Sequence, residues 1–135
     1  MSRKNTRELA LKMVFQHSFS LQDCALAREH VNKPVDEEFL DMLVAGVRRY
    51  GSQLDEIIGR SSQGWTVDRM PRVDRSVLQL AVFELAATDS PTPVIINEAV
   101  ELAKRYSDPA GARFINGVLD SIAAKREQLS LQDHG

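Results

Sequence analysis

Apolar residues recur at helical spacing along almost the whole chain. Between Phe39 and Ile57 an apolar or small side chain appears every three or four residues, which makes one long amphipathic stripe. Pro34 and the acidic residues 36–38 suit the first turn of this helix, and the glycine- and serine-rich residues 59–64 suit its end. Alternating strand patterns and hairpin turns are absent from the sequence. The pattern therefore predicts an all-α fold.

Three more helices are predicted in the second half of the chain. Asp74 suits an N-cap position, and the helix after it is apolar around most of its circumference, so we expect it to lie centrally. The prolines of residues 88–93 end it. The next helix spans about residues 95–106, and a last helix follows the break at residues 108–111. The inward-facing residues of the last helix are Phe114, Ile115, Val118, Leu119 and Ile122.

The remaining segments complete a single predicted domain over residues 1–135. Residues 22–31 suit a short helix, and a flexible tail is expected over about residues 130–135. Gly117 lies inside the last helix, where glycine costs about 1 kcal/mol relative to alanine. Close packing of two helices is the expected reason for this glycine.

The first helix is apolar on two sides. Met13 and His17 lie on one face, whereas Phe15 and Phe19 lie roughly opposite, beside Lys4. One interpretation is a helix sandwiched between two layers of its own bundle. The other is an aromatic and basic surface that binds a partner protein or nucleic acid, where cations neutralise phosphates and rings stack on unpaired bases. The sequence leaves both interpretations open.

Charge is distributed unevenly along the chain. The formal net charge is −2, yet residues 1–20 and residues 104–126 each carry +3. If the fold brings these two basic segments together, they form a positive patch that the net charge conceals. Lys4, Glu8 and Lys12 are also spaced by four residues, which equally suits a solvated helix face with ion pairs.

The sequence offers no constellation for catalysis or metal binding. His17, His30 and His134 are far apart and lack nearby ligands at metal-binding spacing, so neither a metal nor a cofactor is expected. Cys24 has no base placed beside it, and phosphate-binding glycine loops are absent. A single cysteine, no secretory signal and no apolar run of membrane-spanning length predict a cytoplasmic protein that is not an enzyme.

Four runs of residues, in their order and spacing, resemble one family. They are Arg7-Glu8-x-Ala10-Leu11, the run VDRSVLQLAVFEL at 73–85, INEAVELAKRY at 96–106 and FINGVLD at 114–120. Together they resemble the NusB family of bacterial transcription antitermination factors over about residues 3–122. The resemblance implies about seven helices in two packed helical bundles.

The resemblance also implies a function without catalysis. The family binds the boxA element of nascent single-stranded RNA, usually as a heterodimer with the ribosomal protein NusE. That complex joins other Nus factors on RNA polymerase, suppresses termination and supports ribosomal RNA transcription. Residues carried over as RNA contacts are Arg3, Lys4, Arg7, Lys104, Arg105, Tyr106, Arg113 and Phe114.

Two residues fall where the family meets NusE, namely Phe15 and Asp74. Phe15 stands where the family often has tyrosine, so a hydroxyl hydrogen bond is lost there. Asp74 has the alternative role of a helix cap. Asn5 and Thr6 interrupt the arginine-rich start, and we therefore expect weak RNA affinity without the partner.

Two alternative functions use the same fold. The first is a homodimeric protein-interaction module that hides its basic face. The second is a domain of the kind that precedes methyltransferase domains in enzymes that modify ribosomal RNA. The second alternative would need an α/β cofactor-binding domain after residue 135.

Overall fold

The computed structural model describes residues 3–17, 34–62 and 67–132, and every regular element in these ranges is helical. The α-helices are α1 (Arg3–His17), α3 (Glu37–Arg60), α4 (Arg72–Ala87), α5 (Thr92–Tyr106) and α6 (Pro109–Ala123). The described ranges also contain two short 3-10 turns, η1 (Val67–Arg69) and η2 (Arg126–Gln128). The all-α prediction is confirmed for these ranges, which hold five α-helices rather than about seven. The predictions for residues 22–31, Phe19, Cys24, His30 and His134 lie outside them.

Helix α3 begins beside the acidic residues 36–38, as the sequence predicts, whereas α6 begins at Pro109, inside the predicted break at residues 108–111. The Asp36 side chain accepts a hydrogen bond of 3.1 Å from the backbone N–H of Phe39 and so caps α3. Asp108 caps α6 in the same way, with a bond of 2.6 Å from the N–H of Gly111. Pro109 follows in the first turn, where its missing N–H costs nothing. These local signals are therefore sufficient to fix both helix starts.

Helix α4 begins three residues earlier than predicted, and Asp74 is not its N-cap. The N-cap is Pro71, and Asp74 stands in the first turn with no side-chain capping bond. A carboxylate at this position ordinarily accepts the N–H of the N-cap residue, but proline has none to offer. The Asp74 carboxylate is consequently buried without the hydrogen bond that a cap would give it.

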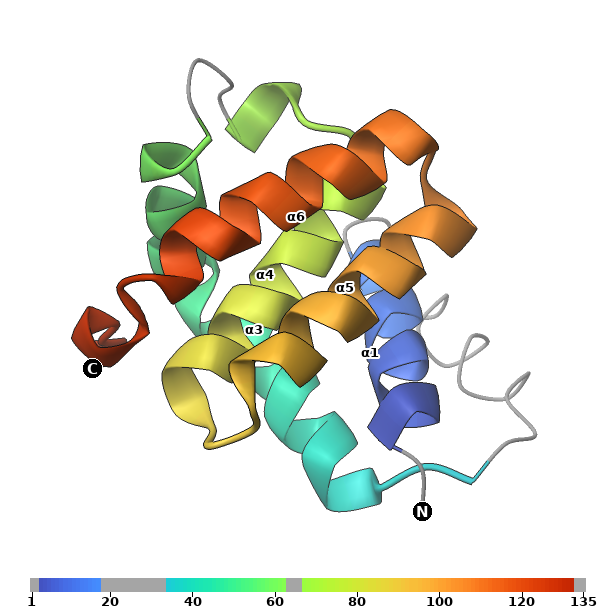
Figure 1. The fold of residues 1–135 in the computed structure, drawn as a ribbon. Coiled ribbons are helices and arrows are strands. Elements are labelled where there is room, and N and C mark those ends of the chain that lie inside the picture. Colours follow the sequence, from blue (N-terminus) through green and yellow to red (C-terminus); the bar gives the residue numbers. More distant parts are fainter. Residues whose placement is uncertain (1–2, 18–33, 63–66, 133–135) are drawn as a thin grey trace.

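Helix α4 is central, as its apolar circumference predicts. It packs against α1, α3, α5 and α6, with α5 and α6 side by side in front of it and α3 behind (Figure 1). Ten residues of α4 are buried, and the core also takes leucines and isoleucines from every other α-helix described. No helix among the described residues is long and apolar enough to cross a membrane.

Helix α1 is sandwiched within the bundle. It packs against α3, α4 and α5, and Leu9, Ala10, Leu11 and Val14 are all buried. Because Ala10 and Leu11 lie about 100° apart on the helix, both apolar sides are covered by this chain. The interpretation of this helix as sandwiched between two layers of its own bundle therefore holds for residues 9–14 of α1.

Two glycines show opposite surroundings. A Cβ atom placed on Gly46 would lie 2.2 Å from Cζ of Phe83, so α3 and α4 approach closely only because this position lacks a side chain. A Cβ placed on Gly117 would meet nothing within 4 Å, and the residue is exposed. The prediction that Gly117 allows close helix packing is therefore wrong, whereas Gly46 serves that purpose.

The C-terminal segment is fastened to the bundle through residue 132. Arg126 donates hydrogen bonds to the backbone carbonyls of Leu85 and Thr88, at 2.9 and 2.7 Å, and so holds the turn between α4 and α5. Gln53 exchanges two hydrogen bonds with the backbone of Gln132, at 2.6 and 2.8 Å. The sequence predicts a flexible tail over about residues 130–135, whereas these bonds anchor the chain as far as residue 132.

Candidate nucleic-acid interface

The two basic segments of the sequence meet in the fold. Arg105, near the end of α5, forms an ion pair with Glu8 of α1. Lys12 of α1 lies 5.8 Å from the ring centroid of Tyr106 and 3.9 Å from a carboxylate oxygen of Glu8. The predicted juxtaposition of the two segments is thus present at the C-terminal end of α5. Glu8 neutralises part of the charge that Lys12 and Arg105 bring there.

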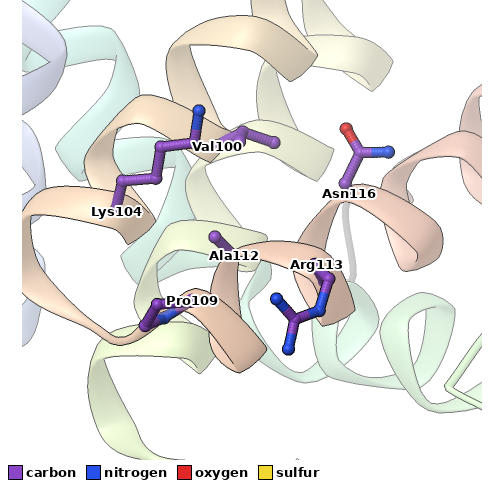
Figure 2. A pocket seen from close by; sticks show the side chains of 6 residues that line it. All are labelled: Val100, Lys104, Pro109, Ala112, Arg113 and Asn116. Carbon is purple, nitrogen blue, oxygen red and sulfur yellow. The ribbon is translucent and has the colours of Figure 1, made fainter.

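A pocket between α5 and α6 extends this basic surface (Figure 2). It has a volume of about 460 Å³ and is lined by Val100 and Lys104 of α5 and by Pro109, Ala112, Arg113 and Asn116 of α6. Lys104 is 61% exposed and lies 3.5 Å from Glu101. Arg113 is exposed and forms no hydrogen bond or ion pair among the described residues. Two cations therefore flank an apolar hollow that carries one side-chain amide.

Arg7 lies inside the protein rather than on this surface. It is 8% exposed, and its Nε and Nη2 atoms donate to the two carboxylate oxygens of Glu84 at 2.9 and 2.5 Å. The Glu84 side chain is only 3% exposed. This two-point ion pair uses the donors that a phosphate would need. We therefore remove Arg7 from the predicted RNA contacts.

Arg3 is at the other end of α1, in acidic surroundings. Its guanidinium lies 4.4 Å from the ring centroid of Phe39, and its Nη1 atom is 3.4 Å from Oγ of Ser90. The groove that it lines, of about 760 Å³, also carries the carboxylates of Asp36, Glu38 and Asp89. These carboxylates oppose a phosphate at this place. Lys4 is exposed beside Arg3 on α1.

The two predicted aromatic contacts occupy different places. Tyr106 is 36% exposed and lies under Lys12 at the meeting point of the basic segments. Phe114 is half-buried and lines a separate pocket of about 360 Å³ between the starts of α4 and α6. The structure therefore joins Tyr106 to the basic surface and separates Phe114 from the pocket that contains Arg113.

Asp74 lies in the same pocket as Phe114. It is 3% exposed, and among the described residues its Oδ1 atom has no hydrogen-bond partner. Met70, Pro71 and Gly111 line the pocket around it. Phe15, the other predicted partner contact, is half-buried near the end of α1. A buried acceptor without a donor is costly, so this pocket is suited to a ligand that brings an N–H or O–H group.

Sequence patterns alone missed several residues of these sites. Val100 lies four residues before the predicted contact Lys104 on α5, and Pro109, Ala112 and Asn116 recur at helical spacing on α6, a signal that could have indicated facing surfaces. Away from these pockets, Arg75 and Asp55 form an ion pair at 2.5 Å, and their hydrogen bond raises the pKa of Arg75 above its usual value. Groups of acidic, cysteine and histidine side chains that could hold a metal do not occur among the described residues.

Comparisons with known proteins agree on one family. The NusB family model matches residues 4–124 of this chain. The chain is 44% identical over 128 residues to a transcription antitermination protein NusB of Anaeromyxobacter dehalogenans, covering 90% of both sequences. Among solved structures, Thermotoga maritima NusB superposes with a TM-score of 0.81 at 32% identity, covering 96% of this chain and 99% of that one.

A second solved structure shows a similar protein in a complex. It contains the antitermination factors NusB and NusE with double-stranded RNA, and the matched chain superposes with a TM-score of 0.79 at 26% identity. The match covers 90% of this chain and 96% of the other. Sequence and fold comparisons both extend over nearly the whole described domain. The chain belongs to the NusB family.

Proposed function

We propose that this chain is an RNA-binding adaptor in transcription antitermination, without a reaction of its own. It binds boxA-type nascent single-stranded RNA together with the ribosomal protein NusE. The complex then joins other Nus factors on RNA polymerase and supports ribosomal RNA transcription. Membership of the NusB family and the similarity to the NusB chain of a NusB–NusE–RNA complex support this proposal. The cytoplasmic location stays a prediction.

The observation that carries the RNA proposal is the convergence of cations at the end of α5. Lys104, Arg105 and Arg113 come from two adjacent helices, and Lys12 joins them from α1. Lys104 and Arg105 are 61% and 51% exposed, so their ion pairs with glutamates are worth little and are readily exchanged for phosphate contacts. Phosphate binding releases counterions from the RNA, which supplies the affinity.

The observation that supports a protein partner is the Oδ1 atom of Asp74. A buried acceptor left without a hydrogen bond costs about 1–3 kcal/mol, and a donor from a partner would recover that free energy. The pocket around Asp74 is largely apolar, with Met70, Pro71 and Phe114 on its walls. We therefore propose that NusE places a donor group there. The role predicted for Phe15 at the same interface stays a prediction.

Fluorescence anisotropy with a boxA RNA and a scrambled RNA tests the proposal. It is measured with and without NusE, across a salt series. We expect preference for boxA, a gain in affinity with NusE, and log affinity that falls linearly with log salt. NusE and RNA must strengthen each other equally because coupling between sites is reciprocal. Equal binding of both RNAs in the presence of NusE would refute specific recognition.

Charge-removing variants locate the surface within the same assay. Lys104→Gln and Arg113→Gln should each weaken binding to every RNA, since each removes one phosphate contact. Arg60→Gln is the matched control, because Arg60 is 71% exposed at the end of α3 and its loss changes the net charge equally. Light scattering measures the oligomeric state and so tests the homodimer alternative, which predicts a stable dimer that fails to bind RNA.

A further inference from the structure

The pocket between α5 and α6 has a composition that phosphate binding alone does not explain. Its walls are apolar, formed by Val100 of α5 and by Pro109 and Ala112 of α6, and Asn116 contributes an amide group (Figure 2). A surface that neutralises phosphates needs only cations. A volume of about 460 Å³ lies within the range of pockets that enclose small organic ligands, about 300–1,000 Å³.

Lys104 and Arg113 line the hollow with their charged ends directed apart, the Lys104 ammonium toward Val100 and the Arg113 guanidinium toward the opposite side (Figure 2). Lys104 lies toward the end of α5 where the chain turns into α6, and Asn116 lies two turns further along α6 (Figure 2). Asn116 lies seven positions after Pro109 on α6, which corresponds to about 10 Å along the helix axis. A nucleotide whose phosphate contacts either Lys104 or Arg113 at the edge of the hollow therefore has room for its base against the apolar walls.

The amide of Asn116 has groups to spare for such a base. One Nδ2 hydrogen is used, since Nδ2 donates to Oδ2 of Asp120 at 3.0 Å, one helical turn away. The structure gives Oδ1 no partner among the described residues, and Nδ2 keeps a second hydrogen. A side-chain amide with one acceptor and one donor free pairs with adenine, whose N6 amino group donates and whose N7 accepts.

We propose that this pocket holds one unstacked adenine nucleotide of the bound RNA. One of the two cations, Lys104 or Arg113, holds its phosphate. Val100, Pro109 and Ala112 contact the faces of its base, and Asn116 reads its N6 and N7 atoms. The inference rests on the proposed RNA-binding function and adds a base-specific subsite to it. Specific recognition of single-stranded RNA depends on such splayed-out bases, whereas phosphate contacts carry no sequence information.

The test couples a change in the protein to a change in one RNA atom. Each adenine of a boxA RNA is replaced in turn by 7-deazaadenine, which lacks the N7 acceptor. We expect one replacement to weaken binding to the unaltered protein about fivefold, the effect of one lost base contact. Asn116→Ala should weaken binding to the unmodified RNA by a similar factor and should be insensitive to that same replacement.

Ser121→Ala is the matched control, because Ser121 is exposed on α6 and does not line the pocket. It should bind every RNA as the unaltered protein does, and thermal melting should show all three proteins folded. If every replacement weakens RNA binding by the unaltered protein and by Asn116→Ala equally, the adenine subsite is overturned. A preference for boxA RNA in the same experiment would still support the proposed function. If boxA preference itself is absent, both proposals fail.

Discussion

Replacing Gly46 by alanine should destabilise the protein, although alanine ordinarily stabilises a helix. The added Cβ would lie 2.2 Å from Cζ of Phe83, whereas ordinary van der Waals contact begins at 3.4 Å. The Phe83 ring would have to retreat by the difference, 1.2 Å. It is 5% exposed and stacks on Tyr50 at a centroid distance of 6.3 Å, so the helices themselves must shift.

The net effect follows from two opposing terms. Overpacking of a filled core costs about 3 kcal/mol at the upper end of its usual range, because a rigid ring rather than a flexible chain is displaced. Alanine returns about 1 kcal/mol through its higher helix propensity. We therefore expect Gly46→Ala to lower the free energy of unfolding by about 2 kcal/mol, which is a large part of a typical total.

Chemical denaturation measures this change, and two other glycines provide controls. Gly51 in α3 and Gly117 in α6 are helical, and an added Cβ meets nothing within 4 Å at either. Alanine at each should raise the free energy of unfolding by about 0.5–1 kcal/mol. Adding Phe83→Leu to Gly46→Ala should cost less than the sum of the single changes. Equal stability of Gly46→Ala and Gly117→Ala would refute the packing explanation.

Three further predictions concern charged residues. Glu84→Gln leaves Arg7 buried without its carboxylate and should cost about 3 kcal/mol in urea denaturation; an unchanged midpoint would contradict the ion pair. Arg126→Met removes the donors that hold the turn between α4 and α5 and should cost about 2 kcal/mol, with faster amide exchange in residues 88–90; unaltered exchange there would contradict this role of Arg126. Arg113→Gln should make the salt slope of RNA binding less negative by about 0.7, and an unchanged slope would remove Arg113 from the phosphate contacts.

The helices were predictable because their signals are local. Apolar spacing, the acidic residues 36–38 and the prolines after α4 each act within a few residues. The start of α4 was misplaced because Asp74 is a common N-cap residue, and only the backbone shows that Pro71 occupies that position. The start of α4 was mispredicted because aspartate suits both the N-cap and the first turn of a helix.

The site was less predictable because its determinants are distant in sequence. Arg7 resembles Arg3 and Lys4 as a residue near a basic terminus, yet its partner Glu84 is 77 positions away on a mostly apolar helix. Sequence spacing cannot show that pairing, and so it cannot show that one arginine is internal. The pocket between α5 and α6 likewise exists only once the two helices pack side by side.

The ion pair between Arg7 and Glu84 also restricts how this sequence can change over generations. Either residue replaced alone leaves a buried charge without a partner, which costs about 3–5 kcal/mol out of a typical total of about 5–15 kcal/mol. Replacement of both by apolar residues of similar volume can be neutral. Each single step toward that neutral state therefore passes through a barely folded protein. Among descendants of this sequence, the arginine at position 7 in α1 and the glutamate at position 84 in α4 should be kept together or lost together.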